Sequence, residues 1–245
     1  MSVKKSSRRK AIAITAVIAL FAFAASFIWI FHSNGYKADA AAIDEYCAGM
    51  TSAVTEIDKG VAYGNGNEEY GFIFYPGGNV EYTAYAPLLR SLAENGVFCV
   101  TIKMPFDLAV FGENAADGIS ESYPEIERWY IGGHSLGGVI AAEYAAKHPQ
   151  GFEGLIMLAS YTTADLSGSG LAVLSIYGSE DGVLNRRKYS ESLDNLPSGY
   201  VERVIDGGCH AYFGMYGAQT GDGQPGITAA EQTGEAARII LDFIN

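Results

Sequence analysis

Cysteine and histidine are scarce in this chain of 245 residues, which has three of the former and four of the latter. Neither a Cys-x-x-Cys nor a His-Glu-x-x-His spacing occurs, so the sequence predicts no metal site. Three cysteines also cannot make a disulfide framework. Cys99 lies in an apolar run and should be a small buried residue, while a Cys47–Cys209 bridge stays open.

Internal repeats and low-complexity tracts are absent as well. With 49% hydrophobic and 18% charged residues, the chain can bury a core, which excludes wholesale disorder, collagen and coiled coil. Basic residues are rare beyond residue 10, where the chain has 11 of them and 28 acidic residues. Because so acidic a body repels phosphate backbones, we expect no nucleic-acid partner.

The N-terminus is a separate element. Residues 1–10 are basic, and residues 11–31 form an uncharged apolar run that is long enough to cross a lipid bilayer at about 1.5 Å per residue. Because basic residues stay on the cytoplasmic side, the run predicts a single-pass transmembrane anchor in the cell membrane, with an extracytoplasmic body. A cleaved signal peptide, which would give a secreted protein, is the alternative. Residues 32–59 should be a spacer with a short helix over residues 40–46.

From about residue 60, short apolar runs alternate with longer helical stretches. We predict strands at residues 71–75, 97–103, 128–131, 154–158, 171–177 and 200–205. We predict helices at residues 82–94, 136–147, 185–195 and 228–244, with a further weak helix between residues 113 and 122. This alternation favours an α/β fold in which helices cover both faces of a mostly parallel sheet. In such folds, ligands bind beyond the carboxyl ends of the strands.

The sequence RWYIGGHSLGGVIAAEYAAK at residues 128–147 reads as a strand, a glycine-rich turn and a helix. The turn holds Ser135 between glycines, which is typical of a nucleophile elbow. A serine needs a base to remove its proton, and His210 follows the last predicted strand, where a base can reach the nucleophile. The other histidines suit this role less: His32 beside the apolar run, His134 within the turn, and His148 at a helix end.

The base in turn needs an acid that orients its ring. Asp181 follows a predicted strand between Ser135 and His210, and it is the preferred candidate. Its neighbour Glu180 is one residue out of phase, and Asp165 and Asp206 remain as alternatives.

Acyl transfer also needs backbone N–H groups that stabilise the oxyanion. One donor should be Leu136, the residue after the nucleophile. The other should come from the Pro-Gly-Gly turn after an early strand, where Gly78 is the first choice and Asn79 the second.

Four motifs together resemble the α/β-hydrolase superfamily: YPGG at 75–78, GGHSLGG at 132–138, GSED at 178–181 and GGCHAYFG at 207–214. The order Ser135, Asp181, His210 is the one typical of that fold. More narrowly, the chain is similar to compact membrane-anchored bacterial α/β-hydrolases that are distantly similar to dienelactone hydrolases. Dienelactone hydrolases use a cysteine nucleophile. The serine at position 135 therefore argues against lactone-diene chemistry and leaves ester hydrolysis open.

Only residues 159–170 separate two strands between which related enzymes carry a cap domain, so we expect no large lid. Residues 106–114 and 211–226 should form the pocket walls, with Tyr212, Phe213 and Tyr216 lining an acyl or aryl pocket. The resemblance implies a serine hydrolase that cleaves a small-molecule carboxylic ester through an acyl-enzyme, without a metal or organic cofactor. An acyltransferase, thioesterase or peptidase on the same triad is the alternative, as is a non-catalytic ligand-binding surface protein.

Overall fold

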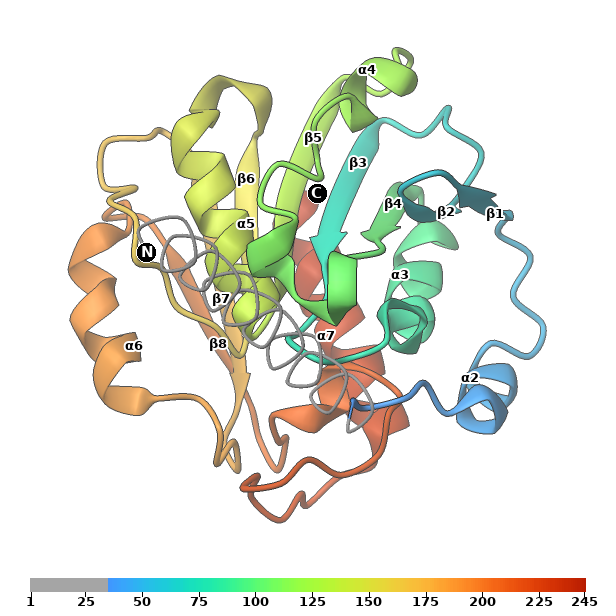
Figure 1. The fold of residues 1–245 in the computed structure, drawn as a ribbon, viewed down its shortest axis with the longest axis vertical. Coiled ribbons are helices and arrows are strands. Elements are labelled where there is room, and N and C mark those ends of the chain that lie inside the picture. The colour runs from blue at the N-terminus through green and yellow to red at the C-terminus, as the bar shows by residue number, and fades with distance from the viewer. Residues whose placement is uncertain (1–34) are drawn as a thin grey trace, which may run out of the picture. The chain divides into compact units, whose positions relative to one another are not determined.

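An eight-stranded sheet organises the part of the chain that the computed structural model describes, residues 35–245 (Figure 1). The strands lie in the order β1-β2-β4-β3-β5-β6-β7-β8. They are β1 (Val54–Ile57), β2 (Gly60–Tyr63), β3 (Tyr70–Tyr75), β4 (Val97–Ile102), β5 (Arg128–His134), β6 (Gly154–Leu158), β7 (Ala172–Gly178) and β8 (Val201–Ile205). The pairs β1–β2 and β2–β4 are antiparallel, and the other neighbouring pairs are parallel.

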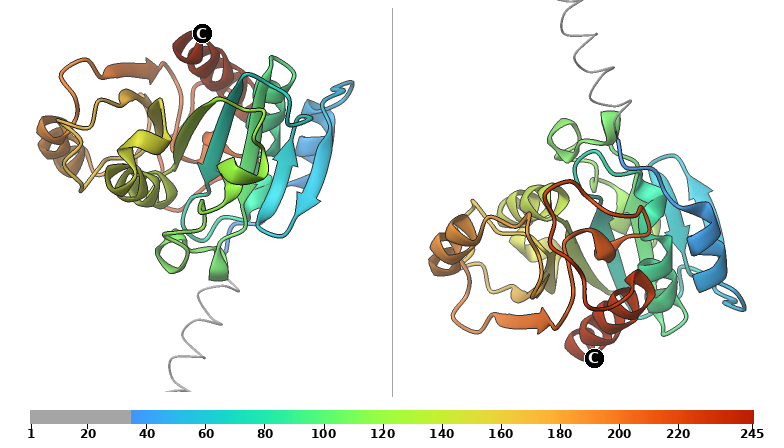
Figure 2. Two further views of the ribbon diagram at one scale, coloured as in Figure 1. Left: turned by 90° about the horizontal axis from the view of Figure 1, so that it is seen from above. Right: turned by 90° about the horizontal axis from the view of Figure 1, so that it is seen from below.

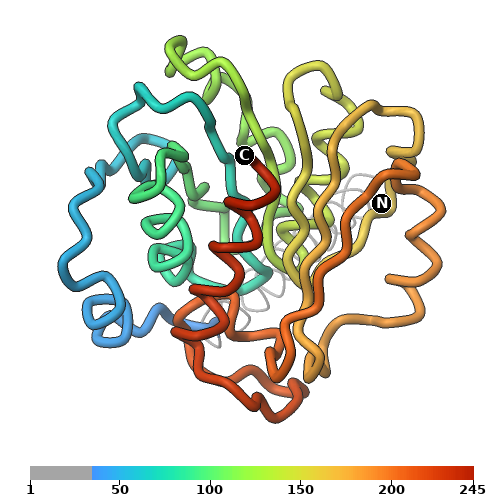
Figure 3. Tube along the Cα trace, turned by 180° about the vertical axis from the view of Figure 1, so that it is seen from behind, coloured from blue at the N-terminus to red at the C-terminus, as the bar shows by residue number. Residues whose placement is uncertain are grey.

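Helices cover both faces of the sheet, as Figure 2 shows from above and below. The helices are α2 (Ala40–Tyr46), α3 (Ala86–Ala93), α4 (Ile119–Ser122), α5 (Leu136–Lys147), α6 (Arg186–Ser192) and α7 (Ala229–Ile244). Helices α3 and α7 pack on the face seen from behind (Figure 3), and α5 packs on the opposite face. A capping box, in which Thr228 and Glu231 satisfy each other's backbone N–H groups, fixes the start of α7.

Strand β3 explains why both layers form. Its Phe72 and Phe74 side chains enter the core under α3 and α7, whereas Ile73 and Tyr75 enter the core under α5. All four are at most 1% exposed. Successive side chains of a strand point to opposite faces, so a strand that is apolar at every position must be covered on both sides.

The parallel register brings the ends of several strands to one edge of the sheet. Tyr75 at the end of β3 pairs with Gly133 of β5, and His134 pairs with Leu158 at the end of β6. Beyond β6 in the sheet order, Gly178 at the end of β7 pairs with Ile205 at the end of β8. The turns that follow these strands therefore lie side by side.

Most of the predicted elements are confirmed. The helix at residues 136–147 and the strand at 154–158 have the predicted bounds, and the remaining strands differ by three residues or fewer at either end. The helix predicted at residues 82–94 begins as a 3₁₀ turn over Tyr82–Tyr85 before α3, and the weak helix shrinks to α4.

The spacer predicted at residues 32–59 is not separate from the domain. The compact unit begins at Tyr36, and β1 lies within the predicted spacer. Sequence patterning misses β1 because most of its residues are exposed, so it lacks the apolar alternation of a half-buried strand. The short helix at residues 40–46 is present as α2, and the Asp39 N–H donates to the Met215 carbonyl at 2.8 Å.

The membrane location that the sequence predicts is corrected here. Residues 11–31, the predicted anchor and bilayer contact, lie outside the described residues. Within residues 35–245, no helix combines the length and the apolar character that crossing a bilayer requires. Helix α7, for example, has 16 residues, whereas about 20 apolar residues are needed. The predicted single-pass placement in the cell membrane is therefore not supported.

The three cysteines are buried free thiols, so the Cys47–Cys209 bridge does not form. This agrees with the expectation for Cys99, which lies within β4.

Candidate active site

Ser135 occupies a strained turn between β5 and α5. Its φ of 50° and ψ of −123° are unusual for a residue with a side chain. The turn also needs glycine on both sides, because an added Cβ on Gly133 or Gly137 would lie 2.4 or 2.2 Å from the Tyr75 carbonyl oxygen. The glycines thus let the turn lie directly against the end of β3, which is the geometry of a nucleophile elbow.

His210 and Asp181 form a buried pair at the ends of β8 and β7. The His210 Nδ1 atom lies 3.1 Å from Asp181 Oδ1 and 3.0 Å from Oδ2, and the two side chains are 2% and 0% exposed. Asp181 Oδ1 also accepts hydrogen bonds from the N–H groups of Val183 at 2.9 Å and Leu184 at 2.8 Å. These contacts fix the carboxylate, which in turn fixes the imidazole ring.

The pairing sets the tautomer of His210. A carboxylate can only accept, so the proton of the neutral ring resides on Nδ1 and the lone pair on Nε2. The Nε2 atom is buried and has no hydrogen-bond partner among the described residues. It is therefore available to take a proton from a hydroxyl group.

A cavity of about 220 Å³ contains both Ser135 and His210 in its lining. The other lining residues are Leu136, Val139, Ala159, Ser160, Tyr161, Val183, Leu184 and Asn185. Lysine, arginine, aspartate and glutamate are absent from this lining set, so the cavity suits an uncharged group. Ser160, which the sequence does not single out, donates a hydrogen bond to the Ser135 carbonyl at 2.8 Å and so supports the strained turn.

The two residues that are predicted to supply oxyanion donors, Gly78 and Leu136, lie next to each other. An added Cβ on Gly78 would lie 3.0 Å from Leu136 Cδ2. The Gly78 N–H makes no hydrogen bond to the described residues, and Leu136 is the first residue of α5, where N–H groups lack partners within the helix. Asn79 is not available, because its N–H donates to the Asp107 carbonyl at 2.7 Å.

A buried tyrosine connects the Pro-Gly-Gly turn to the elbow. The Gly77 N–H donates to Tyr85 Oη at 3.0 Å, and the Tyr85 hydroxyl lies 2.8 Å from His134 Nδ1. Burial raises the pKa of Tyr85, so the phenol keeps its proton and can donate a hydrogen bond to His134 Nδ1. The centroid of the His134 ring lies 4.6 Å from that of the His210 ring, so His134 packs directly against the proposed base.

Replacing Tyr85 with phenylalanine should lower the free energy of unfolding by about 1–3 kcal/mol, because the Gly77 N–H and His134 Nδ1 would be buried without partners. Denaturant unfolding measures this change. Tyr177→Phe is the control, since it removes a hydroxyl whose hydrogen bond to Glu202 is exposed, and it should change stability by less than about 0.5 kcal/mol. Equal effects in the two variants would contradict the connecting role of Tyr85.

His134 should make stability depend on pH. Burial, with a smaller effect of His210, holds the pKa of His134 well below its usual value of 6.5. The unfolded chain binds a proton below about pH 6.5 and the folded chain does not, so the stabilisation is complete above that pH and is lost as the pH falls. Between pH 6.5 and 5, we expect a loss of up to about 1.4 kcal/mol per pH unit.

Unfolding curves of the wild type and of His134→Asn test this, because asparagine can still accept from Tyr85 but does not titrate. The slope should disappear in His134→Asn and persist in His148→Asn, which changes an exposed residue at the end of α5. An unchanged slope in His134→Asn would show that other groups cause the dependence.

The alternative acids lie away from the base. Glu180, Asp165 and Asp206 are exposed, and none of them bonds to His210. Asp165 instead accepts hydrogen bonds from Ser167, in the loop after β6. His148 caps the end of α5 as expected, and His32 lies outside the described residues.

The three aromatic residues predicted to line the pocket do not line this cavity. Phe213 is fully buried, with its ring 5.7 Å from that of His134. Tyr216 is also buried, and Tyr212 packs against the core. The chain turns inward after His210 because the Met215 N–H donates to the Ala84 carbonyl at 2.8 Å.

The other predicted wall, residues 106–114, is not part of the cavity lining either. Phe106 and Phe111 are 51% and 56% exposed and contact each other, with their ring centroids 5.7 Å apart.

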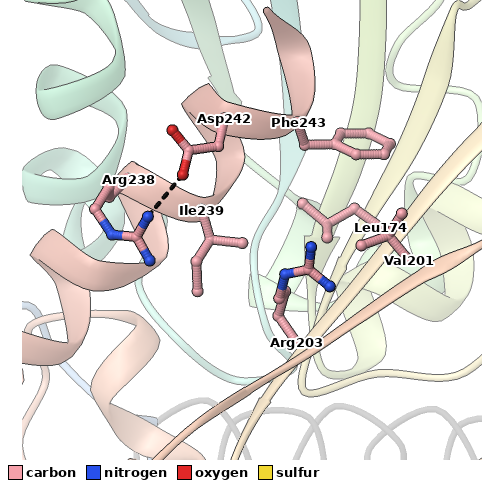
Figure 4. A pocket seen from close by; sticks show the side chains of 7 residues that line it. All are labelled: Leu174, Val201, Arg203, Arg238, Ile239, Asp242 and Phe243. Atoms are coloured by element: carbon pink, nitrogen blue, oxygen red, sulfur yellow. Dashed lines mark hydrogen bonds and ion pairs between the residues drawn. The ribbon is translucent and has the colours of Figure 1, made fainter.

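A larger cavity of about 420 Å³ lies between β8 and α7 (Figure 4). Its lining residues are Leu174, Val201, Arg203, Arg238, Ile239, Asp242 and Phe243. This set offers neither a nucleophile nor a histidine, and Arg238 is already paired with Asp242. Of these two cavities, the smaller one combines a serine with a histidine. Residues 35–245 also contain no cluster of three or more metal-ligating side chains.

Solved structures share this fold. A carboxylesterase structure from the thaumarchaeon Nitrososphaera gargenis matches with a TM-score of 0.57 and 14% identity, covering 78% of this chain and 97% of the other. Carboxyl esterase 2 from the fungus Tuber melanosporum matches with a TM-score of 0.58 and 11% identity, covering 86% and 90%. A predicted CIB-like hydrolase from Thermoplasma acidophilum matches with a TM-score of 0.54 and 16% identity, covering 79% and 97%. At these identities the likeness shows the fold alone.

No curated protein matches the sequence. The sequence profile of the alpha/beta hydrolase family, however, matches residues 71–234, which include the elbow, the Asp181 loop and His210. The match spans more than half of the chain and agrees with the sheet order and the strand-end turns. The chain therefore belongs to the alpha/beta hydrolase family.

Proposed function

We propose that the protein is a serine hydrolase that cleaves small-molecule carboxylic esters through an acyl-enzyme. The observation that carries the proposal is the buried His210–Asp181 pair, in which the His210 Nε2 atom has no partner among the described residues and His210 lines the same cavity as Ser135. Family membership and the esterase structures with the same fold support it further.

The reaction follows from the roles of these groups. Ser135 Oγ attacks the ester carbonyl while His210 Nε2 takes the hydroxyl proton, and Asp181 stabilises the imidazolium that forms. The N–H groups of Leu136 and Gly78 hold the negative oxygen of the tetrahedral intermediate. His210 then gives the proton to the leaving alcohol, which departs and leaves an acyl-Ser135. Water, activated by the same base, releases the acid and restores the hydroxyl.

A fluorophosphonate probe tests the proposal on the full chain, because it reacts covalently with an activated serine. Peptide mass spectrometry should find the adduct on Ser135 and should find none in His210→Ala. A folded protein that forms no adduct would contradict the proposal and favour the non-catalytic binding role.

The cavity also sets an expectation for the acyl group. Its volume of about 220 Å³ is below the range of about 300–1,000 Å³ that is usual for ligand pockets. If the acyl group occupies this space, kcat/KM should be at least about 10-fold higher for p-nitrophenyl butyrate than for the decanoate. A series of p-nitrophenyl esters measures this preference, and a value that rises up to the ten-carbon acid would place the acyl group elsewhere.

A further inference from the structure

A second carboxylate, which is partly buried, lies beside the His210–Asp181 pair. Asp222, in the segment between Phe213 and α7, accepts four backbone hydrogen bonds with its two oxygens. Its Oδ1 atom accepts from Gly182 at 3.1 Å, from His210 at 3.1 Å and from the adjacent Gly223 at 2.8 Å. Its Oδ2 atom accepts from Ala211 at 2.8 Å.

The donors belong to the two loops that carry the proposed acid and base. Gly182 follows Asp181 directly, and the N–H groups of His210 and Ala211 belong to the base and its neighbour. One side chain thus holds the backbone on both sides of the Nδ1–carboxylate hydrogen bond. Its carboxylate is separate from the one that holds the imidazole, since His210 Nδ1 bonds to Asp181.

Close backbone packing joins the segment at residues 221–223 to the acid loop. An added Cβ on Gly223 would lie 1.9 Å from the Glu180 carbonyl oxygen, and one on Gly182 would lie 2.8 Å from the Gly221 carbonyl oxygen. The glycines on both sides of this contact let the backbones approach, and the approach places Asp222 within reach of all four donors.

We propose that Asp222 is a positioning residue that sets the geometry of the Asp181–His210 pair by joining the two loops. This inference rests on the proposed serine hydrolase function. Asp222 is not among the residues that line the cavity with Ser135, so it acts through the pair and not on the substrate.

The chemistry of the four donors requires a carboxylate. Each N–H needs an acceptor, and an ionised carboxylate is the side chain that offers two oxygens without a donor. Burial acts to raise the pKa of Asp222, but the backbone N–H groups outweigh it and hold the pKa below the ordinary aspartate value. The group is therefore charged at neutral pH. An amide in its place would keep one oxygen acceptor but would turn its NH₂ group towards at least one of these backbone N–H donors.

Asp222→Asn in the full chain tests the inference. We expect kcat for p-nitrophenyl butyrate to fall about 10- to 100-fold, since a small displacement of catalytic groups has an effect of this size. The KM value should stay within about twofold of the wild type, because the cavity itself is unchanged. The downfield proton NMR signal of His210 Nδ1–H should shift or broaden. Asp165→Asn is the matched control, because that carboxylate also accepts a backbone N–H but joins no loop of the site.

Asp222→Ala serves as a second variant, since it removes every side-chain acceptor, whereas asparagine keeps one carbonyl oxygen. It should lose more kcat than Asp222→Asn. Wild-type kcat and an unchanged Nδ1–H signal in a folded Asp222→Asn protein would overturn the inference. Failure of both variants to fold would also overturn it, because the role of Asp222 would then be structural. A failure of the proposed function looks different: wild-type Ser135 would form no fluorophosphonate adduct.

Discussion

Replacing Ser135 with alanine should lower kcat for p-nitrophenyl butyrate by about four to six orders of magnitude. The side chain supplies the only oxygen that the proposed reaction acylates, and loss of a serine nucleophile has an effect of this size in other serine hydrolases. The fold should survive, because alanine is smaller and the turn is held by its backbone. The Ser135 N–H donates to the Leu158 carbonyl at 2.9 Å, and the Ser160 hydroxyl donates to the Ser135 carbonyl. Steady-state kinetics measures the loss of kcat, and a thermal unfolding curve checks that the fold survives.

Two further variants sharpen this prediction. His210→Ala should lose nearly as much kcat as Ser135→Ala, and the double variant should lose hardly more than either one, because nucleophile and base act as one unit. Ser167→Ala, an exposed serine bonded to Asp165, should keep full turnover. Substantial turnover in Ser135→Ala would mean that another group forms the acyl-enzyme or that water attacks directly.

The elbow could be predicted because its determinants are contiguous in sequence. A strand, a glycine on each side of Ser135 and an alanine-rich helix lie within one run of twenty residues, and the structure has β5 and α5 there. His210 and Asp181 were also accessible, since each follows an apolar strand within a few residues. Local patterning suffices where a side chain is positioned by the element that precedes it.

Contacts between segments that are distant in sequence could not be predicted in this way. Tyr85 bridges Gly77 and His134, which are 57 residues apart, and no local pattern marks it. Asp222 lies in a glycine-rich segment without a local signal for its role, although it accepts a hydrogen bond from Gly182, 40 residues earlier. Such positions are determined by where the fold brings two backbones together, which a single sequence does not display.

The misplaced aromatic residues have the same cause. Tyr212, Phe213 and Tyr216 follow within six residues of His210, so proximity in sequence favours a place in the pocket. The direction of that loop, however, depends on the hydrogen bond from Met215 to Ala84 and on the Asp222 contacts. These bonds turn Phe213 and Tyr216 into the core.

Asp181→Asn should lower kcat by about three to four orders of magnitude while leaving the fold intact. Asparagine has nearly the shape of aspartate, and its carbonyl oxygen can still accept from the N–H groups of Val183 and Leu184. Its amide would then face His210 Nδ1 as a donor, so the ring proton would move to Nε2 and the base would lose its lone pair on the side of Ser135. Steady-state kinetics with p-nitrophenyl butyrate measures the loss.

The neighbouring residue provides the control for this tautomer argument. Glu180→Gln makes the same chemical change one residue away, on an exposed side chain that does not bond to the base, and it should leave kcat unchanged. Proton NMR should still show a folded protein in Asp181→Asn, but without the downfield Nδ1–H signal of His210. If Asp181→Asn instead kept wild-type turnover, the imidazole would not need this carboxylate. Since Asp181 is the acidic side chain bonded to Nδ1, the assignment of the acid would then have to be abandoned.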